Sequence, residues 1–473
     1  MKPLQYISSR CHVLVAVLSC SMLVLCGSCS IDIAPADQYS DPDAITTVAA
    51  GRSMLSSVYA SYPHYELQLS LLADDYCPTS LQGQDASLAR FYNWDENAIS
   101  DFAETAWQAY YSTISSCNTL LERVGSIQTA NESQQQEKSY IIAEANTLKA
   151  MSYFDLLRLF APSYAAGEDN DGILLKEHLA LEYLGRSSVK ACTDTIVSLL
   201  TQAASVAHEP KSNGWLSQTA CRYLLAEVYL YKGDWAQAAA WARQVIDAGG
   251  DGRFTASAYT QLWSTGQSAQ RIFAFNTDQT YYTEVLANPV TDGDLYMLNP
   301  QLTYADGDIR RTLNVNAMDM QGTTRNLMGK YAGMIHQETT PTYVNRMRYA
   351  GAYFIAAEAY SRLGQDDEAR SLVNHFLTLV GGTAIPETVT GTALTDSILH
   401  EKQLEFAGEG TRYFDLKRTR KAGLPRLARW GSSVSSTIDA GDYRWTWPIP
   451  RSEYLYNENV TQNEGWPLSR QDK

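Results

Sequence analysis

The sequence predicts a mainly α-helical fold that is built from antiparallel helical hairpins and carries few short strands. Apolar side chains recur every three to four residues along several long segments, the period of a helix with one buried face. Glycine-containing turns interrupt two of these segments, and residues 249–344 show turn chemistry in place of helical periodicity. We therefore expect a helical scaffold with one irregular, loop-rich insertion that carries the ligand-binding groups.

Residues 219–246 contain the clearest hairpin. Leu224, Leu225 and Val228 share one helical face. Gly233 can adopt the left-handed conformation of a C-terminal cap, and Asp234 can cap the helix that follows. The segment therefore reads as two antiparallel helices joined by a tight turn.

The pattern returns in residues 348–377, and a weaker copy covers residues 138–160. Such copies resemble tetratricopeptide repeats, in which each hairpin stacks on its neighbours to bury its apolar face. The alternative is a pair of unrelated amphipathic hairpins. Four small or aromatic positions match at one constant spacing: Ala226 and Ala357, Tyr229 and Tyr360, Gly233 and Gly364, and Ala238 and Ala369.

The composition favours a globular protein that does not bind nucleic acid. The chain has 473 residues, 45% hydrophobic and 19% charged, which is enough for a large core. Its net charge is −15, and no Lys/Arg cluster lies on a predicted helix face, whereas phosphate contacts need concentrated positive charge. No Pro/Ser-rich linker divides the chain, so we predict a single domain over residues 43–473.

Residues 1–28 read as an export signal, because a basic start precedes a short apolar run that ends in small residues. Cys29 follows, and the pattern resembles a bacterial lipobox, in which this cysteine becomes the lipidated N-terminus. Residues 29–42 are then a polar tether. The competing acceptor is Cys26, and the competing interpretation is a protein secreted without a lipid.

The other cysteines are expected to be structural. They are not in CxxC pairs, and they read mainly as small buried side chains, with one disulfide possible. No His/Cys cluster has the spacing of metal ligands, and we expect no metal and no cofactor. The four residues are Cys77, Cys117, Cys192 and Cys221.

Further helices are expected along the chain. The first covers residues 43–62, with Asp41 or Asp43 as its cap. Residues 69–97 lack a helical period, and a long helix follows them. A late helix covers residues 394–408.

The late helix leads into a run that resembles a known signature. Residues 401–418, with Glu405, Glu409, Arg412 and Asp415, are similar to the charged motif of SusD/RagB-type outer-membrane lipoproteins of Bacteroidetes. The run departs from the usual pattern at Lys402 and Gln403, where basic residues are common. Four other stretches agree: Trp107, Tyr110, Ile114 and Asn118; Ala143 to Ala145 before Phe154; Arg348 to Ala350 before Ala357; and Pro448 to Pro450 with Gln462, Asn463 and Gly465.

The resemblance implies a tetratricopeptide-like, lipid-anchored protein on the outer surface of the outer membrane, partnered with a SusC-type TonB-dependent transporter. Members of this family feed glycans, or in some cases peptides, into the transporter and are not catalytic. We expect capture of a glycan or oligosaccharide, with peptide capture as the alternative.

The charged run also has a direct physical interpretation. Glu405, Glu409, Arg412, Asp415 and Arg418 recur at intervals of three or four residues, so opposite charges can pair along or just beyond a helix end. We favour a structural network here over a charged ligand site.

A sugar site needs an aromatic platform beside short polar side chains. Trp94 and Asn97 supply both, and Asp74 and Asp75 lie upstream. In starch-binding members of the family a similar Trp, Asn and Asp contact the glycan, which implies ligand contacts at Asp75, Trp94 and Asn97. We expect the second wall to come from tyrosines of the insertion: Tyr281, Tyr282, Tyr296, Tyr304 or Tyr331.

A glycoside hydrolase is the competing enzymatic hypothesis. It needs two carboxylates ~5–10 Å apart across a cleft. Asp74, Asp75, Asp95 and Glu96 are the acids near the predicted platform. No nucleophile-elbow, zinc-protease or phosphate-loop motif favours other chemistry, and we predict that the protein is not an enzyme.

Overall fold

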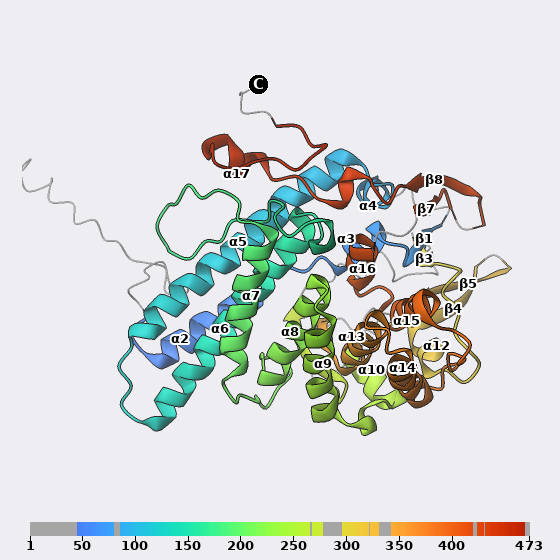
Figure 1. Ribbon diagram of the computed structural model, residues 1–473, viewed down its shortest axis with the longest axis horizontal. Helices are drawn as coiled ribbons and strands as arrows, with labels where there is room; N and C mark the ends of the chain where they lie inside the picture. Colours follow the sequence, from blue (N-terminus) through green and yellow to red (C-terminus); the bar gives the residue numbers. More distant parts are fainter. Residues whose placement is uncertain are drawn as a thin grey trace, which may run out of the picture. The chain divides into compact units, whose positions relative to one another are not determined.

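Helices dominate the structure, and successive long helices pack side by side (Figure 1). The computed structural model describes residues 45–79, 86–264, 267–277, 296–320, 322–330, 342–419, 423–429 and 431–468. No helix in these ranges combines the length and the apolar character that crossing a membrane requires.

The described α-helices are distributed along the whole of the described chain. They are α2 (Val48–Ala60), α3 (Glu66–Leu72), α4 (Ala86–Tyr92), α5 (Glu96–Ser126), α6 (Glu132–Phe160), α7 (Val189–Ala204), α8 (Gln218–Lys232), α9 (Trp235–Gly249), α10 (Ala256–Ser264), α12 (Ile309–Asn314), α13 (Tyr349–Arg362), α14 (Asp366–Val380), α15 (Gly391–Phe406), α16 (Thr411–Thr419) and α17 (Arg451–Tyr456). Short 3-10 helices are η3 (Tyr164–Ala166), η4 (Asp251–Arg253) and η6 (Tyr443–Trp445).

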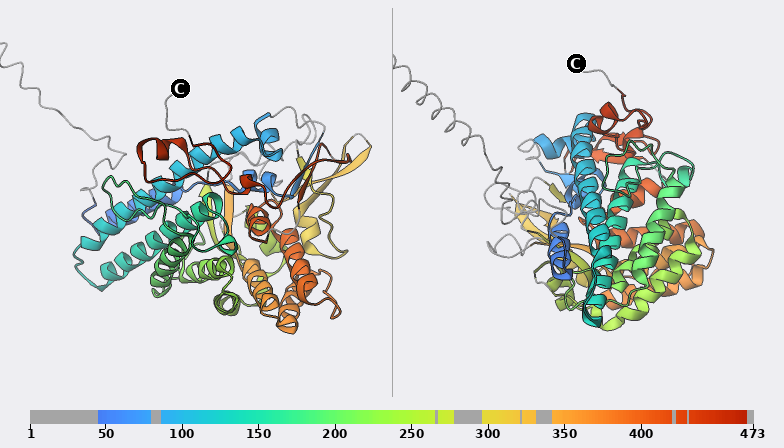
Figure 2. Two further views of the ribbon diagram at one scale, coloured as in Figure 1. Left: turned by 45° about the horizontal axis from the view of Figure 1, so that its top comes forward. Right: turned by 90° about the vertical axis from the view of Figure 1, so that its left-hand side faces the viewer.

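The long helices form a continuous stack in chain order. α5 packs on α6, α6 on α7, α7 on α8 and α8 on α9. α9 then packs on α13, which contacts both α14 and α15, and the views of Figure 2 show the same order. Each helix buries its apolar face against its neighbours, as tetratricopeptide-like hairpins do. The predicted mainly α fold is confirmed.

The two hairpins with glycine turns are α8–α9 and α13–α14. Gly233 ends α8 with a φ of 77°, and Asp234 caps α9 by accepting a hydrogen bond from the backbone N–H of Gln237 at 3.2 Å. Gly364 has a φ of 74° between α13 and α14. Both turns need glycine, because a Cβ clashes with the backbone in the left-handed conformation.

The segment 138–160, predicted as a third hairpin, is part of the single helix α6 and makes up all of it except the first turn and a half. This helix packs against α5 before it and α7 after it. Residues 161–188 separate α6 from α7, so no tight turn follows. The helical period is therefore correct, but the partner helix lies further along the chain than a repeat unit requires.

Short helices lie in two segments predicted to be irregular. α4 and the end of α3 fall within residues 69–97, and α10 and α12 fall within the insertion. None of the four exceeds nine residues, which is too short for a helical period to show in the sequence. The start of α2 also differs, because Thr47 caps it by accepting from the N–H of Ala50 at 3.1 Å.

The strands described in the structure pair as antiparallel two-stranded sheets. β1 (Tyr76–Pro78) pairs with β3 (Tyr296–Leu298), β2 (Arg271–Thr277) with β6 (Thr342–Arg348), β4 (Val315–Met320) with β5 (Thr323–Met328), and β7 (Leu424–Leu427) with β8 (Val434–Ile438). All but β2 and β6 gather beyond α15 and α16 (Figure 1). We call β1, β3, β4, β5, β7 and β8 the strand-rich end. There Cys77 and Leu327 form a small core that Leu427 covers.

The four cysteines expected to be structural are buried free thiols: Cys77, Cys117, Cys192 and Cys221. Burial raises the pKa of the Cys117 thiol to about 12, so this group stays protonated and unreactive at neutral pH. The interpretation as small core side chains is confirmed, and the one possible disulfide among them does not form.

Candidate functional site

An open hollow of about 750 Å³ lies beside the strand-rich end. Residues 302–308, α12 and the strands β4 and β5 form its walls, and all of them belong to the predicted insertion. Its size falls within the range of small-molecule and oligosaccharide sites, roughly 300–1,000 Å³. We call it the insertion hollow. Its exposed polar lining residues are Thr303, Asp306, Arg311, Thr312 and Asn326.

The floor of the insertion hollow is fixed to α15. The hydroxyl of Tyr304 donates a hydrogen bond to the carbonyl of Leu404 at 2.8 Å, and the amide of Asn314 donates to the same carbonyl at 3.3 Å. The buried guanidinium of Arg310 holds the carboxylate of Asp308 at 2.7 Å and that of Glu401 at 2.8 Å. Such fixed walls lose little conformational entropy when a ligand binds.

The exposed groups of the hollow suit a ligand with many hydroxyl groups. Thr303 and Thr312 carry hydroxyls that donate and accept, and Asn326 carries an amide that does the same. Arg311 is paired with Asp306 on the surface, with half of its own side chain still exposed. Half-buried Tyr304 is the one aromatic side chain among the described lining residues.

The charged run 401–418 forms the base of the strand-rich end. Arg348, at the end of β6, binds Glu405 at 2.6 Å and Glu409 at 2.7 Å. Lys330, just after β5, donates to Glu409 at 2.7 Å and to the carbonyls of Glu405 and Ala407. Burial disfavours the charge of Glu409, but Arg348 and Lys330 outweigh that effect and lower its pKa.

The same run holds β1 and α13. Arg412 binds the carboxylate of Asp74, just before β1, at 2.7 Å. Arg418 binds Glu358 of α13 at 2.5 Å and Asp415 at 2.7 Å. The interpretation of the run as a structural network is therefore confirmed. Most of its partners lie outside the run, in segments that the spacing of the charges could not reveal.

Asp75, a predicted ligand contact, faces the interior. Its side chain is 0% exposed, and one carboxylate oxygen accepts from the backbone N–H of Gly408 at 3.1 Å. Burial and, second, the neighbouring charge of Asp74 raise the pKa of Asp75 to about 7. The prediction is corrected accordingly: Asp75 fixes the turn at Gly408 and offers no surface to a ligand.

Trp94, the predicted platform, is also 0% exposed. Its indole N–H donates to the carbonyl of Leu72 at 2.9 Å, and its ring packs edge-on against Trp445 with centroids 4.6 Å apart. Both ring faces are therefore covered, and the platform prediction is corrected to a core position. Asn97 lies on the exposed surface in the first turn of α5, so the two side chains do not form a joint site.

The other predicted contacts are only partly described. Tyr296 lies in β3 opposite Pro78 of β1, at the strand-rich end. Tyr281, Tyr282, Tyr331 and the lipidation residue Cys29 lie outside the described residues.

The four acids considered for a hydrolase all have structural partners. Asp74 is paired with Arg412, and Asp75 is buried as described. Asp95 caps α5 through the N–H of Ala98, and that bond, with Arg90, lowers its pKa. Glu96 accepts a hydrogen bond from the hydroxyl of Tyr443. These carboxylates are engaged in holding the fold.

The sequence analysis missed the polar lining of the insertion hollow: Thr303, Asp306, Arg311, Thr312 and Asn326. One feature of its walls could be read from the sequence. Asp308 is a residue type that often caps a helix, and it caps α12 by accepting a hydrogen bond from the N–H of Arg310 at 2.9 Å. Gly322, with a φ of 77°, marks the turn between β4 and β5. The meeting of these elements around one hollow depends on tertiary contacts and carries no local signal.

Fold and site define a class of protein: a stacked-hairpin scaffold that holds a ligand-sized hollow in an insertion. Comparison with known proteins identifies the group within that class. The sequence model described as "SusD family" matches residues 211–466, and one described as "Starch-binding associating with outer membrane" matches residues 35–230. The first match covers more than half of the chain, so the protein belongs to the SusD family.

Three relatives illustrate the similarity. "SusD-like protein P38" of Formosa agariphila is 32% identical over 165 residues, which is 33% of this chain and only 31% of that protein. "SusD-like protein P2" of the same organism is 22% identical over 93% of this chain and 97% of its own length. A solved structure named "Putative sugar binding protein" from Bacteroides vulgatus is 21% identical, with a TM-score of 0.73 over 89% of this chain and 99% of that one.

Proposed function

We propose that the protein captures glycans or oligosaccharides at the cell surface and delivers them to a SusC-type TonB-dependent outer-membrane transporter. A lipid on Cys29 anchors it to the outer membrane. Membership of the SusD family supports this proposal, as do the family description that mentions starch binding at the outer membrane and a structural neighbour named as a sugar-binding protein.

The observation that carries the proposal is the insertion hollow, which is open, carries exposed polar side chains on an otherwise largely apolar wall, and is fixed to the scaffold through Tyr304, Asn314 and Arg310. A glycan offers hydroxyl groups that pair with short polar side chains on a rigid wall. Binding then needs little rearrangement of the protein, which suits a molecule that must also release its cargo.

The proposed ligand contacts are the exposed polar residues of the hollow. Tyr281, Tyr282, Tyr296, Tyr331 and Asn97 stay predicted contacts from the sequence. Asp75 and Trp94 do not contact the ligand in this proposal. They hold the backbone in place through their hydrogen bonds to Gly408 and Leu72.

Peptide capture, as in RagB-like members of the family, is the second candidate. The exposed pair of Arg311 and Asp306 at the hollow favours it, because the two charges could bind the carboxylate and ammonium ends of a short peptide. The two functions differ in ligand, whereas the site and the delivery step are shared.

Calorimetric titration of the mature protein against a panel of oligosaccharides and a panel of short peptides tests the assignment. We expect saturable binding to oligosaccharides. We also expect Arg311→Gln to weaken it about tenfold or more, since a hydrogen bond from a charged group contributes roughly 1.5–3 kcal/mol. Arg243→Gln is the matched control, because Arg243 forms a similar exposed pair with Asp247 on α9. Equal effects of the two variants on binding would show that the insertion hollow is not the binding site.

We further propose that the protein does not cleave what it binds. Chromatography of each oligosaccharide after long incubation with the pure protein should show no new product. Release of shorter sugars that depends on the protein contradicts the proposal and restores the hydrolase hypothesis.

A further inference from the structure

A second cavity, of about 290 Å³, lies where four segments of the scaffold meet and shares no lining residue with the insertion hollow. Its walls come from residues 209–219, which lead into α8, from η4, from the start of β2 and from Tyr349 at the start of α13. We call it the polar pocket, because most of the side chains that line it carry polar groups. Its volume is close to the lower limit of small-molecule sites, roughly 300 Å³, so it suits a small ligand.

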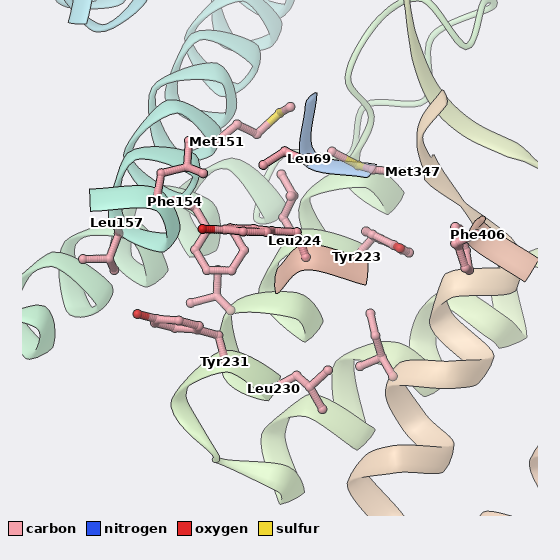
Figure 3. Close-up of a cluster of buried hydrophobic side chains, with 14 of the residues drawn as sticks. Leu69, Met151, Phe154, Leu157, Tyr223, Leu224, Leu230, Tyr231, Met347 and Phe406 are labelled. Atoms are coloured by element: carbon pink, nitrogen blue, oxygen red, sulfur yellow. The ribbon is translucent and has the colours of Figure 1, made fainter. Parts of the chain in front are cut away.

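The walls of the polar pocket are held in place by the core. Met347, two residues before Tyr349, is 1% exposed and lies among the buried side chains of Figure 3. The backbone N–H of Tyr349 donates to the carbonyl of Gln270 at 3.0 Å, which joins α13 to the segment before β2. Ser217 caps α8 by accepting from the N–H of Ala220 at 3.0 Å. A ligand therefore meets walls that need little ordering on binding.

Glu209 lines the polar pocket with an open carboxylate oxygen. Its other oxygen accepts from the N–H of Thr219 at 3.2 Å and from the hydroxyl of the same residue at 3.0 Å, and these bonds fix the orientation of the carboxylate. The open oxygen has no hydrogen bond among the described residues. Because the side chain is exposed, a ligand can reach this oxygen.

Arg253 lines the same pocket with an open nitrogen. Its Nε–H donates to the carbonyl of Gly249, and one terminal nitrogen donates to the carbonyl of Ala269 at 2.9 Å. The guanidinium lies 4.3 Å from the centroid of the Tyr349 ring. The second terminal nitrogen has no hydrogen bond within the described chain and is not enclosed, so its N–H groups can donate to a ligand.

Two uncharged groups add to these. Tyr349 is only 8% exposed, yet its hydroxyl makes no hydrogen bond to a described residue and is not enclosed. Burial raises the pKa of this hydroxyl, and the charges of Arg253 and Glu209 act on it in opposite directions, so both charges lie near it. The side-chain oxygen of Asn213 is an open acceptor, because its amide nitrogen donates to the carbonyl of Arg271 at 2.9 Å.

The charges of the polar pocket decide which ligand fits it. Glu209 and Arg253 form no ion pair with each other or with another residue that the structure describes. The third charged lining residue, Arg271, is 2% exposed and donates to the side-chain oxygen of Asn345 at 2.8 Å, so it is turned away from a ligand.

Hydrogen bonds between two charged groups are about twice as strong as neutral ones, so a ligand with both charges binds more tightly here than a neutral sugar. A ligand with a single charge leaves one of the two groups unmatched. We infer that the polar pocket binds a small zwitterion with the chemistry of an α-amino acid, its ammonium group on Glu209 and its carboxylate on Arg253.

Calorimetric titration of the mature protein in mildly acidic buffer tests the charge requirement. Serine carries both charges, N-acetylserine only the carboxylate and serinamide only the ammonium group. We expect saturable binding of serine and about tenfold or weaker binding of each singly charged analogue, because each loses one charged contact. Glycylglycine carries the same two charges further apart, so the tighter binder of the two zwitterions identifies the source as a free amino acid or a short peptide.

Two outcomes of these titrations overturn the inference. The first is that neither serine nor glycylglycine shows saturable binding. The second is that the singly charged analogues, or glucose, bind as tightly as the zwitterions.

Variants test the assigned contacts. Glu209→Gln keeps an oxygen for Thr219 but removes the charge, and it should weaken serine binding about tenfold while changing N-acetylserine binding little. Tyr349→Phe keeps the ring beside Arg253 and removes only the open hydroxyl, so it should weaken serine binding about threefold. Glu122→Gln, on the exposed surface of α5, is the matched control and should bind serine normally. Serine binding that is unchanged in Glu209→Gln contradicts the assignment.

This inference does not rest on the proposed function, because no residue lines both the polar pocket and the insertion hollow. Serine should therefore not displace an oligosaccharide from the protein. Failure of the serine titration removes only this inference, and failure of the oligosaccharide titration removes only the proposed function.

Discussion

At the scale of single residues, buried charges define this protein. Lys330, Arg348 and Glu405 have side chains that are 0% exposed, and Glu409 is almost as deeply buried. A buried ion needs a partner and hydrogen bonds, because the energy lost with its hydration is otherwise not recovered. Here each charge meets an opposite charge at hydrogen-bond distance, so the cluster is stable only when complete.

Arg348→Met should therefore destabilise the fold strongly. It leaves Glu405 and Glu409 without their guanidinium partner, and breaking a buried pair in this way lowers the free energy of unfolding by about 3–5 kcal/mol. Urea unfolding followed by circular dichroism measures the change. Arg243→Met, which breaks an exposed pair, should lower it by less than about 1 kcal/mol. Similar losses for the two variants would show that the buried network is not what stabilises this region.

Asp75 should make stability depend on pH. Its pKa of about 7 in the folded protein exceeds the ordinary value of 3.8, so between these limits the folded state binds a proton that the unfolded state has released. Stability must then fall as the pH rises from about 4 to about 7. Asp75→Asn removes this titration and should be more stabilising at pH 8 than at pH 4.5, by about 3 kcal/mol. If Asp75→Asn changes the free energy of unfolding by the same amount at pH 4.5 and at pH 8, the pKa of Asp75 is not raised.

At the scale of elements, local sequence determines the helices and their turns. Gly233 and Gly364 have positive φ values that close the two hairpins, and Gly364 has open space around the position of a Cβ. Glycine is therefore required at residue 364 by the left-handed backbone conformation itself, and not by contact with a neighbouring segment.

Gly364→Ala should lower the free energy of unfolding by about 1–2 kcal/mol, the cost of placing an alanine in the left-handed region. Gly125→Ala is its control. Gly125 is the next-to-last residue of α5 and has open space around it, so alanine there should not lower stability and should raise it by up to about 0.5 kcal/mol. Differential scanning calorimetry of both variants gives the comparison, and equal shifts would contradict the role of the turn.

These elements also show how far the sequence could predict the structure. The hairpins at Gly233 and Gly364 could be predicted because their signals lie within a few residues of the turn. The burial of Trp94 could not, because it depends on Trp445, which lies far away in the sequence. The charge spacing of residues 401–418 indicated a network, but the partners Arg348 and Lys330 come from segments without a shared pattern.

At the scale of the whole molecule, the scaffold and the insertion have separate tasks. Stacked helices provide a rigid body, and the run 401–418 fixes β1, α12 and the end of β5 to it. The insertion hollow therefore opens on a surface whose base cannot shift easily. On this account, changes in the residues that line the hollow can alter which ligand binds, while the scaffold and its charged network stay the same.

The proposed membrane anchor is tested by Cys29→Ser in the full-length chain. We expect the unaltered protein in the outer-membrane fraction and the variant in the soluble fraction, because the acyl chains on this residue would supply the attachment. Cys26→Ser is the control and should not change the distribution. Membrane association of both variants would contradict lipidation at Cys29.

The most direct test is a crystal structure of the mature protein with the oligosaccharide that binds it most tightly in the titrations. The account predicts an intact sugar in the insertion hollow, in contact with at least two of Thr303, Arg311, Thr312 and Asn326, above an unchanged network of Arg348, Glu405 and Glu409. A sugar bound on the helical hairpins with the hollow empty, or a cleaved sugar, would contradict it.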